Sequence, residues 1–389
     1  MTNDSKSERP TAAAPVTAAA VGFIPSLHGL RAIAALGVVF FHWVSIFPTF
    51  NIWLAQFQIP GHPWLNPTLP WALGWQGVPL FFVLSGYLLT SQWLTRGLSL
   101  QSLVHFYKRR ALRIYPAVWV QLLVLVGLAG LLPTIWTPVT WHSLIPNVVM
   151  WINLPPVFTS PINDVWWTLP VELMFYLILP LLVWLRRRVG LMLVMTLLAS
   201  ITVGWRWWVT HQHSGENMAA HLAILDSLPG TLFTFGAGFA IAHMQVHLKP
   251  THATRILWMS VAGFFAVQTV LVSNIEVYWQ GGWLLRIWSS TLAMSLAGFV
   301  LAICLGAGGF LAKLCSSNTM VWLGELSFGI YLWHFPVMQL LNALYPQLAP
   351  SAGGSLLALA ITIALTLGLA ALSYYKLERP LMEARMETS

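Results

Sequence analysis

The sequence predicts an all-α polytopic membrane protein with about ten transmembrane helices and both termini in the cytoplasm. Three observations lead to this fold class. The 389 residues are 57% hydrophobic and 8% charged, with a mean hydropathy of +0.72, whereas soluble domains carry about 25% charged residues. The apolar runs far exceed the roughly ten-residue strands of an outer-membrane barrel. Basic residues also gather in alternate connections between these runs, as expected for helices that cross a bilayer.

A helix needs about 20 apolar residues to cross a bilayer, so this chain has room for about ten crossings and no separate soluble domain. We expect residues 1–22, rich in Ala, Thr, Pro and Ser, to form a disordered solvated tail and not a secretory signal. Residues 23–380 would form one membrane domain, followed by a C-terminal tail at 381–389. The expected spans are 24–47, 71–94, 113–133, 166–185, 189–209, 226–246, 255–273, 284–304, 322–345 and 354–376.

Lys and Arg outnumber Asp and Glu by 19 to 11, and their positions explain the net charge of +8. With a cytoplasmic N-terminus, 16 of the 19 fall in inside segments: Lys6, Arg9, Arg96, Lys108, Arg109, Arg110, Arg113, Arg186, Arg187, Arg188, Lys249, Arg255, Lys313, Lys376, Arg379 and Arg385. The excess positive charge is therefore explained by the orientation of the helices in the membrane, and we expect no nucleic-acid partner. Cys304 and Cys315 form no disulfide or zinc motif, and we interpret both as packing residues.

The first span contains two ionisable residues, Arg31 and His42, which are functional candidates because charged groups are costly inside a membrane. Eleven positions at 3.6 residues per turn place them within about 20° of one face and about 16 Å apart along the axis. The two residues would therefore lie at two different depths in the membrane along one continuous site. The alternative is that Arg31 snorkels to the surface and His42 only bonds a neighbouring helix.

Arg110 and Arg113 lie in the basic block that precedes the third span, three residues apart and so on one helical face. Their planar guanidinium groups suit phosphate, and with Arg31 they would form an anion site at the inner membrane face. The alternative is ordinary stop-transfer charge.

Glu172 lies in the fourth span at roughly the depth of His42, and an unpaired carboxylate there is expensive. We expect His42 to be its partner, because a carboxylate that orients the imidazole suits a general-base histidine. Arg206, near the outer end of the fifth span, is the structural competitor.

Ser85 and His334 are candidates for positioning substrate. Ser85 precedes Gly86, and such a pair most often allows close helix packing. Ser327, Tyr331 and His334 share one helical face through their spacing, although a buried histidine with one hydrogen bond is the plainer interpretation. His211, His213 and His221 have no helical metal-ligand spacing, so we expect no metal site.

These segments together resemble the acyltransferase-3 family of membrane acyltransferases, relatives of O-antigen and Nod-factor acetylases. Six motifs in order carry the resemblance nearly end to end: the Arg31/His42 pair, FFVLSGYLL around Ser85, RRALRIYP with Arg110 and Arg113, WWTLPVELMFY with Glu172, LSFGIYLWHFPV with His334, and YYKLERP with Glu378. His28 stands where relatives often have Asp, so no acidic role is transferred to it. Some relatives carry an extra periplasmic domain; here we expect the membrane domain to act alone or with a partner.

The resemblance implies transfer of an acyl group, usually acetyl from cytoplasmic acetyl-CoA, to a hydroxyl of a surface polysaccharide or its lipid-linked precursor at a bacterial plasma membrane. We expect Arg31, Arg110 and Arg113 to hold the phosphates of the acyl-CoA, and His42, oriented by Glu172, to act as general base without a metal. A covalent acyl-enzyme on His42 or Ser85 is the rival mechanism.

Two alternatives to this function stay open at the level of the sequence. A transporter or flippase for an acylated or lipid-linked glycan would use the same intramembrane charges to line a pathway, although no motif is repeated between the two halves of the chain. A small macrolide-like metabolite could replace the glycan as acceptor. Neither the acyl chain length nor the oligomeric state can be predicted.

The charge distribution predicts that the 134–165 loop lies outside. In a background with Cys304 and Cys315 replaced by serine, Thr159→Cys should react with a membrane-impermeant maleimide in intact cells. Arg187→Cys, in a predicted inside segment, is the control and should react only after lysis. The opposite pattern of labelling would reverse the predicted orientation.

Overall fold

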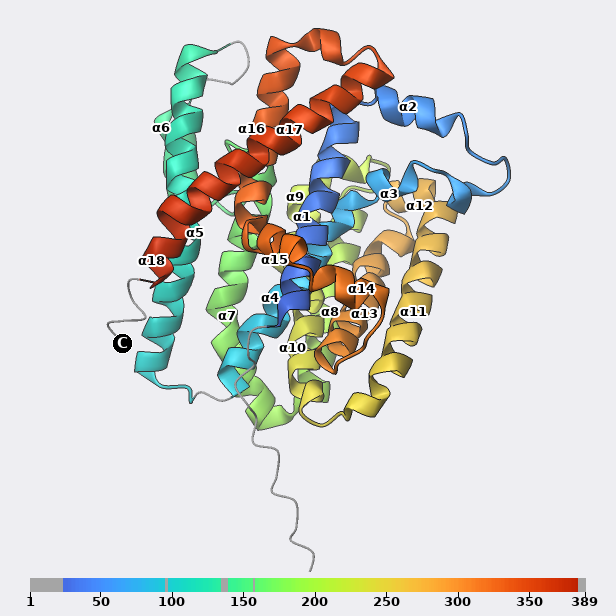
Figure 1. Ribbon diagram of the computed structural model, residues 1–389. Helices are drawn as coiled ribbons and strands as arrows, with labels where there is room; N and C mark the ends of the chain where they lie inside the picture. The colour runs from blue at the N-terminus through green and yellow to red at the C-terminus, as the bar shows by residue number, and fades with distance from the viewer. Residues whose placement is uncertain (1–23, 95–96, 134–138, 157, 384–389) are drawn as a thin grey trace, which may run out of the picture.

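A computed structural model describes residues 24–94, 97–133, 139–156 and 158–383, and within these ranges every regular element is helical (Figure 1). The expected tail at 1–22 and most of the tail at 381–389 lie outside the described residues. The first residues of the latter belong instead to α18 (Arg379–Glu383). The all-α prediction is confirmed.

Eight helices in the described part of the chain are long and apolar enough to cross a membrane. A ninth span is possible where Met218–Leu225 and Leu228–Gln245 join at a bend of 62°. The eight are Pro25–Ile46 (α1), Gly74–Leu94 (containing α4, Gly77–Leu94), Leu100–Leu131 (α5), Asp164–Val189 (containing α7, Thr168–Val189), Leu191–Gln212 (α8), Pro250–Ser273 (containing α11, Ala253–Ser273), Trp283–Cys304 (α13) and Ala352–Glu383 (containing α17, Ala352–Ser373). The chain is a polytopic membrane protein.

The remaining elements are shorter helices that connect these spans or cover their ends, together with two 18-residue helices, α10 and α16, that lie inside the bundle. They are α2 (Thr49–Ala55), α3 (Leu69–Ala72), α6 (Trp141–Val149), α9 (Leu222–Leu225), α10 (Leu228–Gln245), α12 (Ile275–Trp279), α14 (Phe310–Cys315), α15 (Asn318–Glu325), α16 (Ser327–Leu344) and the π-helical turn η7 (Tyr374–Glu378).

The predicted span 322–345 is wrong as a single helix, because the chain breaks at Leu326 between α15 and α16. A Cβ on Gly324 would lie 2.0 Å from the carbonyl oxygen of His28, so α15 packs directly on the backbone of the first turn of α1. The Ser327 hydroxyl donates to the carbonyl of Gly324 at 2.7 Å and satisfies the end of α15. Close packing on α1 therefore separates α15 from the axis of α16.

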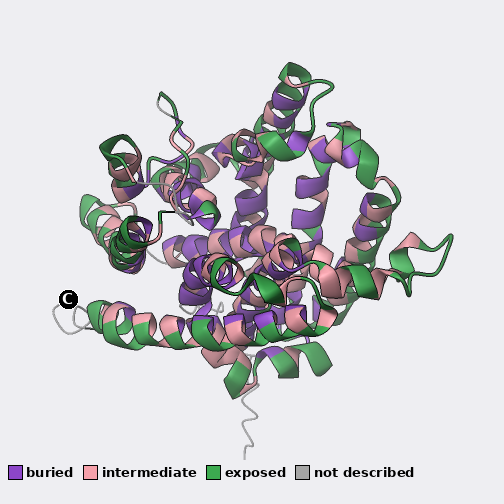
Figure 2. Cartoon of the chain, turned by 90° about the horizontal axis from the view of Figure 1, so that it is seen from above, coloured by how far each residue is buried: buried purple, intermediate pink, exposed green. Residues whose placement is uncertain are grey.

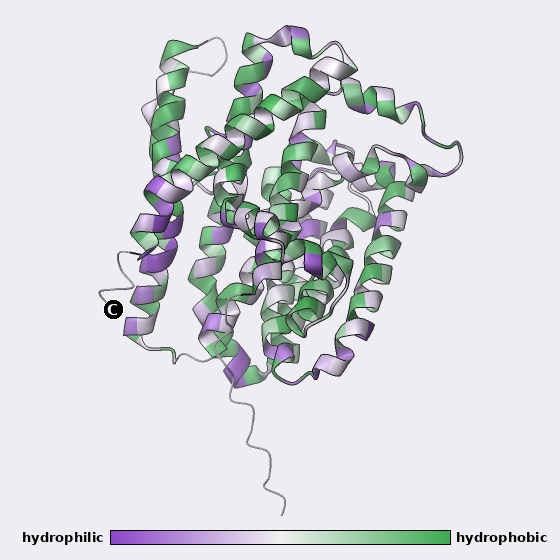
Figure 3. Ribbon diagram, in the orientation of Figure 1, coloured by the Kyte–Doolittle hydropathy of each residue, from purple (hydrophilic) through white to green (hydrophobic). Residues whose placement is uncertain are grey.

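Helix α1 lies in the middle of the bundle, between α4, α15 and α16 (Figure 1). Behind it, α10 packs between α4, α8 and α13, and α11 covers α13 at one side. Helix α17 crosses over α16 near the front of the view, and α5 stands at the opposite side from α11. Seen from above, the inner helices carry most of the buried residues (Figure 2). The outer helices carry many hydrophobic residues (Figure 3). Many of these residues are exposed, which suits a lipid-facing surface.

Helices α4 and α10 cross with their backbones in contact. A Cβ on Gly86 would lie 2.1 Å from the carbonyl oxygen of Phe235, and a Cβ on Gly238 would lie 2.0 Å from that of Val83. No other residue type fits at either position without moving backbone. The packing role expected for the Ser-Gly pair therefore belongs to Gly86, which leaves the Ser85 side chain free for another contact.

A buried polar network connects α16 to α5 and to the turn η3 (Asp164–Trp167). Pro336 has no N–H, so the carbonyl of Leu332 four residues earlier lacks its helical donor. The Gln121 amide donates to that carbonyl at 2.6 Å, and the Asn163 amide donates at 3.0 Å. The Trp166 indole donates to the side-chain oxygen of Gln121 at 2.8 Å. Side chains thus replace the hydrogen bond that proline removes.

Some of the segments predicted to be inside lie together at one end of the bundle. Arg186, Arg187 and Arg188 end α7, and the α10–α11 connection and the start of α5 lie at the same lower end of the view (Figure 3). Helix α5 is longer than predicted, because it begins at Leu100 and spans about 48 Å at 1.5 Å per residue. Its basic block is therefore part of the helix and not a loop before it.

The network predicts a stability cost at Gln121. Gln121→Leu removes one donor from Leu332 and the acceptor of Trp166, which should cost about 1–3 kcal/mol for the unsatisfied buried groups. Thermal unfolding of the purified protein in detergent should show a lower midpoint. Gln101→Leu, on an exposed position of the same helix, is the matched control. Equal midpoints for the two variants would contradict the proposed importance of the network.

Candidate functional site

A cavity of about 260 Å³ lies between α1, α4, α5, α7 and α16. Apolar side chains such as Phe82 and Ile114 form part of its wall, and the remainder is polar. The polar lining residues are His28, Arg31, Ser85, Gln92, Arg110, Arg113, Thr168, Glu172, Tyr176, Ser327 and Tyr331. The cavity therefore brings together five of the residues predicted for the site, from four helices: Arg31, Ser85, Arg110, Arg113 and Glu172.

Three guanidinium groups make the cavity cationic, as the sequence predicts. The Arg31 Nε donates to the Ser327 hydroxyl at 3.3 Å. The Arg110 guanidinium lies 5.9 Å from the ring centre of Phe106 and 6.0 Å from that of Tyr176. Its Nε is buried and has no hydrogen-bond partner among the described residues. The site thus keeps donors available for an anion.

Glu172 lies in this cavity and not beside His42, so the predicted pairing is wrong. Its Oε1 accepts a hydrogen bond from Ser85 at 3.0 Å and one from Tyr176 at 2.5 Å. The competitor Arg206 does not reach it either, because Arg206 forms a buried ion pair with Asp226 at 2.7 Å. Glu172 is therefore a counter-charge to the arginines of the cavity.

The start of α7 explains why the depth argument failed. Helix α7 begins inside the bundle, where the Tyr331 hydroxyl bonds the Thr168 hydroxyl at 2.8 Å and also donates to the carbonyl of Val165. Tyr331 precedes His334 by three residues on α16, so the first turn of α7 lies one turn below the histidine. Glu172, one further turn along α7, consequently lies at the level of the arginines.

His42 and His334 form a hydrogen-bonded pair of imidazoles. His334 Nε2 lies 3.0 Å from His42 Nδ1, and His334 Nδ1 lies 3.0 Å from the carbonyl oxygen of Ile330. A carbonyl can only accept, so neutral His334 carries its proton on Nδ1 and accepts at Nε2. His42 must then donate from Nδ1, which also lies 3.0 Å from the carbonyl oxygen of Val38. This arrangement leaves the lone pair of neutral His42 on Nε2.

The imidazole pair lies outside the lining of the cavity but connects to it through α16. Ser327 and Tyr331 line the cavity, and the ring centres of Tyr331 and His334 are 6.0 Å apart. Phe335 stands edge-on to His42, with ring centres 5.0 Å apart. Ser327 and Tyr331 therefore face the cavity together, and His334, further along α16, lies between the cavity and His42.

Sequence reasoning missed several residues of the site. Tyr176 follows Glu172 by four residues, a spacing that places both on one helical face, and this signal was available. Gln121 and Asn163 gave no such signal, because their partner is a backbone carbonyl on a helix far away in the sequence.

Comparisons with known proteins found a matching family profile and several similar proteins. A family profile described as an acyltransferase domain matches residues 24–375. Peptidoglycan O-acetyltransferase OatA of Listeria monocytogenes serovar 1/2a is 27% identical over 385 residues, covering 92% of this chain and 56% of that protein. O-acetyltransferase OatA of Staphylococcus aureus strain NCTC 8325 is 25% identical over 350 residues, covering 84% of this chain and 52% of that protein.

The chain therefore spans about half the length of the curated relatives it matches. A comparison with solved structures gave no match.

Proposed function

Because the chain belongs to the acyltransferase-3 family, we propose that it is a membrane O-acetyltransferase that acts on a hydroxyl of a cell-surface polysaccharide or its lipid-linked precursor. The donor is cytoplasmic acetyl-CoA, and the protein resides in a bacterial plasma membrane. One observation carries the mechanism: the hydrogen bonds of His42 leave its Nε2 as a free base within a membrane-spanning helix.

In this mechanism His42 Nε2 takes the proton of the acceptor hydroxyl as its oxygen attacks the thioester carbonyl. The new C–O bond forms as the C–S bond breaks, and the proton then passes to the leaving thiolate, which gives free CoA and an ester. General-base assistance of this kind typically contributes about 10² to 10⁴ in rate. His334, and not Glu172, would hold the imidazole of His42 in the required tautomer.

The arginine cavity supports an anionic donor. Its three guanidinium groups, against the one carboxylate of Glu172, suit the phosphates of acyl-CoA. The cavity of about 260 Å³ is smaller than the roughly 300–1,000 Å³ of pockets that enclose a drug-sized ligand. It would therefore hold only the phosphate-bearing part of the donor, with the pantetheine arm directed along α16 toward His42.

The choice of acceptors to test is guided by the names of the relatives. The Listeria relative is named for peptidoglycan, so muropeptides and lipid-linked precursors are the first acceptors to test. The purified protein in nanodiscs should release free CoA thiol from acetyl-CoA only when an acceptor is present. A transporter or flippase would move the glycan without thiol release, and that result would refute the proposed reaction.

The arginines should control donor affinity. Arg113→Lys keeps the charge but loses the planar fork, so acetyl-CoA should bind more weakly while the protein still inserts. Arg110→Ala should weaken binding further, because it removes one of the guanidinium groups of the cavity. Arg109→Ala is the matched control, since Arg109 is exposed and does not line the cavity. If the Arg109 and Arg110 variants bind acetyl-CoA equally well, these basic residues serve only to set the orientation of the protein in the membrane.

The histidine pair should control the chemical step. His42→Ala should reduce acetyl transfer by at least about 10² while acetyl-CoA still binds. His334→Ala should give a smaller loss of kcat with unchanged donor affinity, because it removes one of the two acceptors of the His42 N–H and leaves the carbonyl of Val38. Glu172→Gln should instead change donor affinity. Membrane yield and donor binding are measured in the same preparations, and wild-type turnover in His42→Ala would rule out the general-base mechanism.

A further inference from the structure

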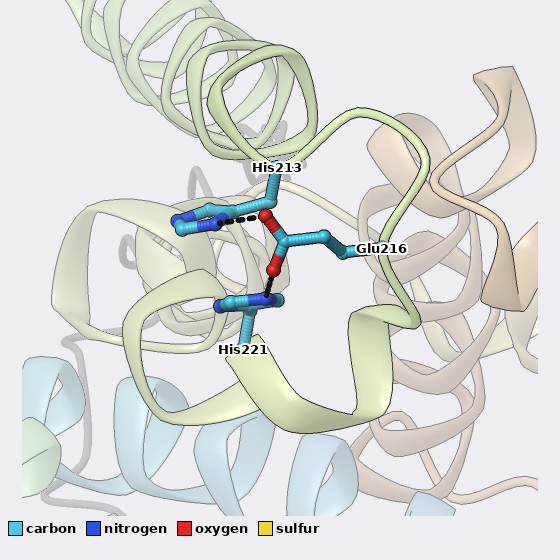
Figure 4. Close-up of side chains that lie close together, drawn as sticks. All are labelled: His213, Glu216 and His221. Carbon is cyan, nitrogen blue, oxygen red and sulfur yellow. Dashed lines mark hydrogen bonds and ion pairs between the residues drawn. The ribbon is translucent and has the colours of Figure 1, made fainter.

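A second group of ionisable side chains lies at the C-terminal end of α8 (Figure 4), and none of its residues lines the arginine cavity. His213 follows the last residue of α8, Glu216 lies in the connecting turn, and His221 ends the short helix η4 (Met218–His221). One ligand atom from each residue lies within 4.8 Å of the other two. The turn gathers three potential metal ligands from nine consecutive residues.

Local backbone geometry creates this arrangement. Gly215 has φ +87°, a left-handed conformation that favours glycine and reverses the chain between His213 and Glu216. The Asn217 side chain then accepts from the backbone N–H of Ala219 at 2.9 Å and caps η4. The imidazoles of His213 and His221 stack with ring centres 3.7 Å apart, and the helical spacing sought in the sequence is not needed.

The carboxylate of Glu216 lies at the edges of both imidazoles (Figure 4). Its Oε1 is 3.5 Å from His213 Nδ1, and its Oε2 is 2.6 Å from His221 Nε2. Each carboxylate oxygen thus faces a ring nitrogen of one histidine, and the three potential ligand groups point toward one another (Figure 4).

From this geometry we propose that His213, Glu216 and His221 form a site for a divalent transition metal, with Zn²⁺ as the ion that the ligands suit best. Two imidazole nitrogens and one carboxylate oxygen are a common zinc ligand set with an open fourth position. Ligand atoms about 2.0–2.1 Å from a tetrahedral ion lie roughly 3.4 Å apart. One ligand atom from each of the three residues lies within 4.8 Å of the other two, so each separation exceeds this value by at most about 1.4 Å.

The exposure of the site agrees with an ion that keeps water ligands. The side chains of His213 and His221 are 30% and 19% exposed, and that of Glu216 is 55% exposed. The site lies at the opposite end of α8 from Arg186, Arg187 and Arg188, which immediately precede that helix. With the predicted orientation it faces the outside, where it would tie the end of α8 to the η4–α9 segment that leads into α10.

The test is Zn²⁺ binding by the full-length protein in detergent, purified without a polyhistidine tag and stripped with a chelator. Isothermal titration should give about one tight site per chain, and Co²⁺ should produce the visible absorption of a tetrahedral ion. His213→Ala and His221→Ala should each weaken Zn²⁺ binding by more than about 100-fold, since losing an outer-sphere partner alone costs 10–100-fold. Glu216→Gln, which keeps the shape of the turn, should also weaken it.

His211→Ala is the matched control, because His211 is an exposed histidine on the last turn of α8 whose ring stacks on Trp207 and is not one of the three ligands. Its Zn²⁺ affinity should equal that of the parent chain. Absence of tight binding in the parent chain, or equal affinities in Glu216→Gln and His211→Ala, would overturn the proposal and leave a hydrogen-bonded His-Glu-His turn.

Discussion

The carbonyl of Leu332 is the point on which the candidate site depends. Pro336 deprives this carbonyl of its helical donor in a region where no bulk water can replace it. Gln121 of α5 and Asn163 before α7 supply the donors. These hydrogen bonds fix the positions of α16, α5 and the start of α7 relative to one another. Helix α16 carries His334, α5 carries two of the cavity arginines, and α7 carries Glu172.

The bundle separates charged from neutral polar groups. The carboxylate of Glu172 accepts from Ser85 and Tyr176 within the cavity that the arginines line, so its charge is compensated where other charges already lie. His42 and His334 satisfy each other and two backbone carbonyls without a carboxylate. A neutral imidazole pair costs less free energy at membrane depth than an ion pair, and its one uncommitted nitrogen is the atom that the proposed general-base step would use.

Most helices and the grouping of the arginines could be predicted, because apolar runs and basic clusters are local features of the sequence. Arg31, Arg110 and Arg113 were expected at one site and line one cavity. The partner of Glu172 could not be predicted, because its depth was counted from an expected helix end. Helix α7 in fact begins within the bundle, at a contact between Thr168 and Tyr331 that joins distant segments. The break at Leu326 was missed for the same reason, since it depends on the contact of Gly324 with the backbone of His28.

The glycine crossing of α4 and α10 has a mechanical consequence. Contact between the backbones at Gly86 and Gly238 holds α4 and α10 together as one closely packed unit. The helices joined at the Leu332 carbonyl form a second unit. The arginine cavity lies between the two, and the hydrogen bond from Ser85 on α4 to Glu172 on α7 spans their boundary. A donor that needs a wider cavity would therefore have to separate α4 and α10 from α7, and both this hydrogen bond and the stacking of Phe175 on Phe235 of α10 oppose that separation.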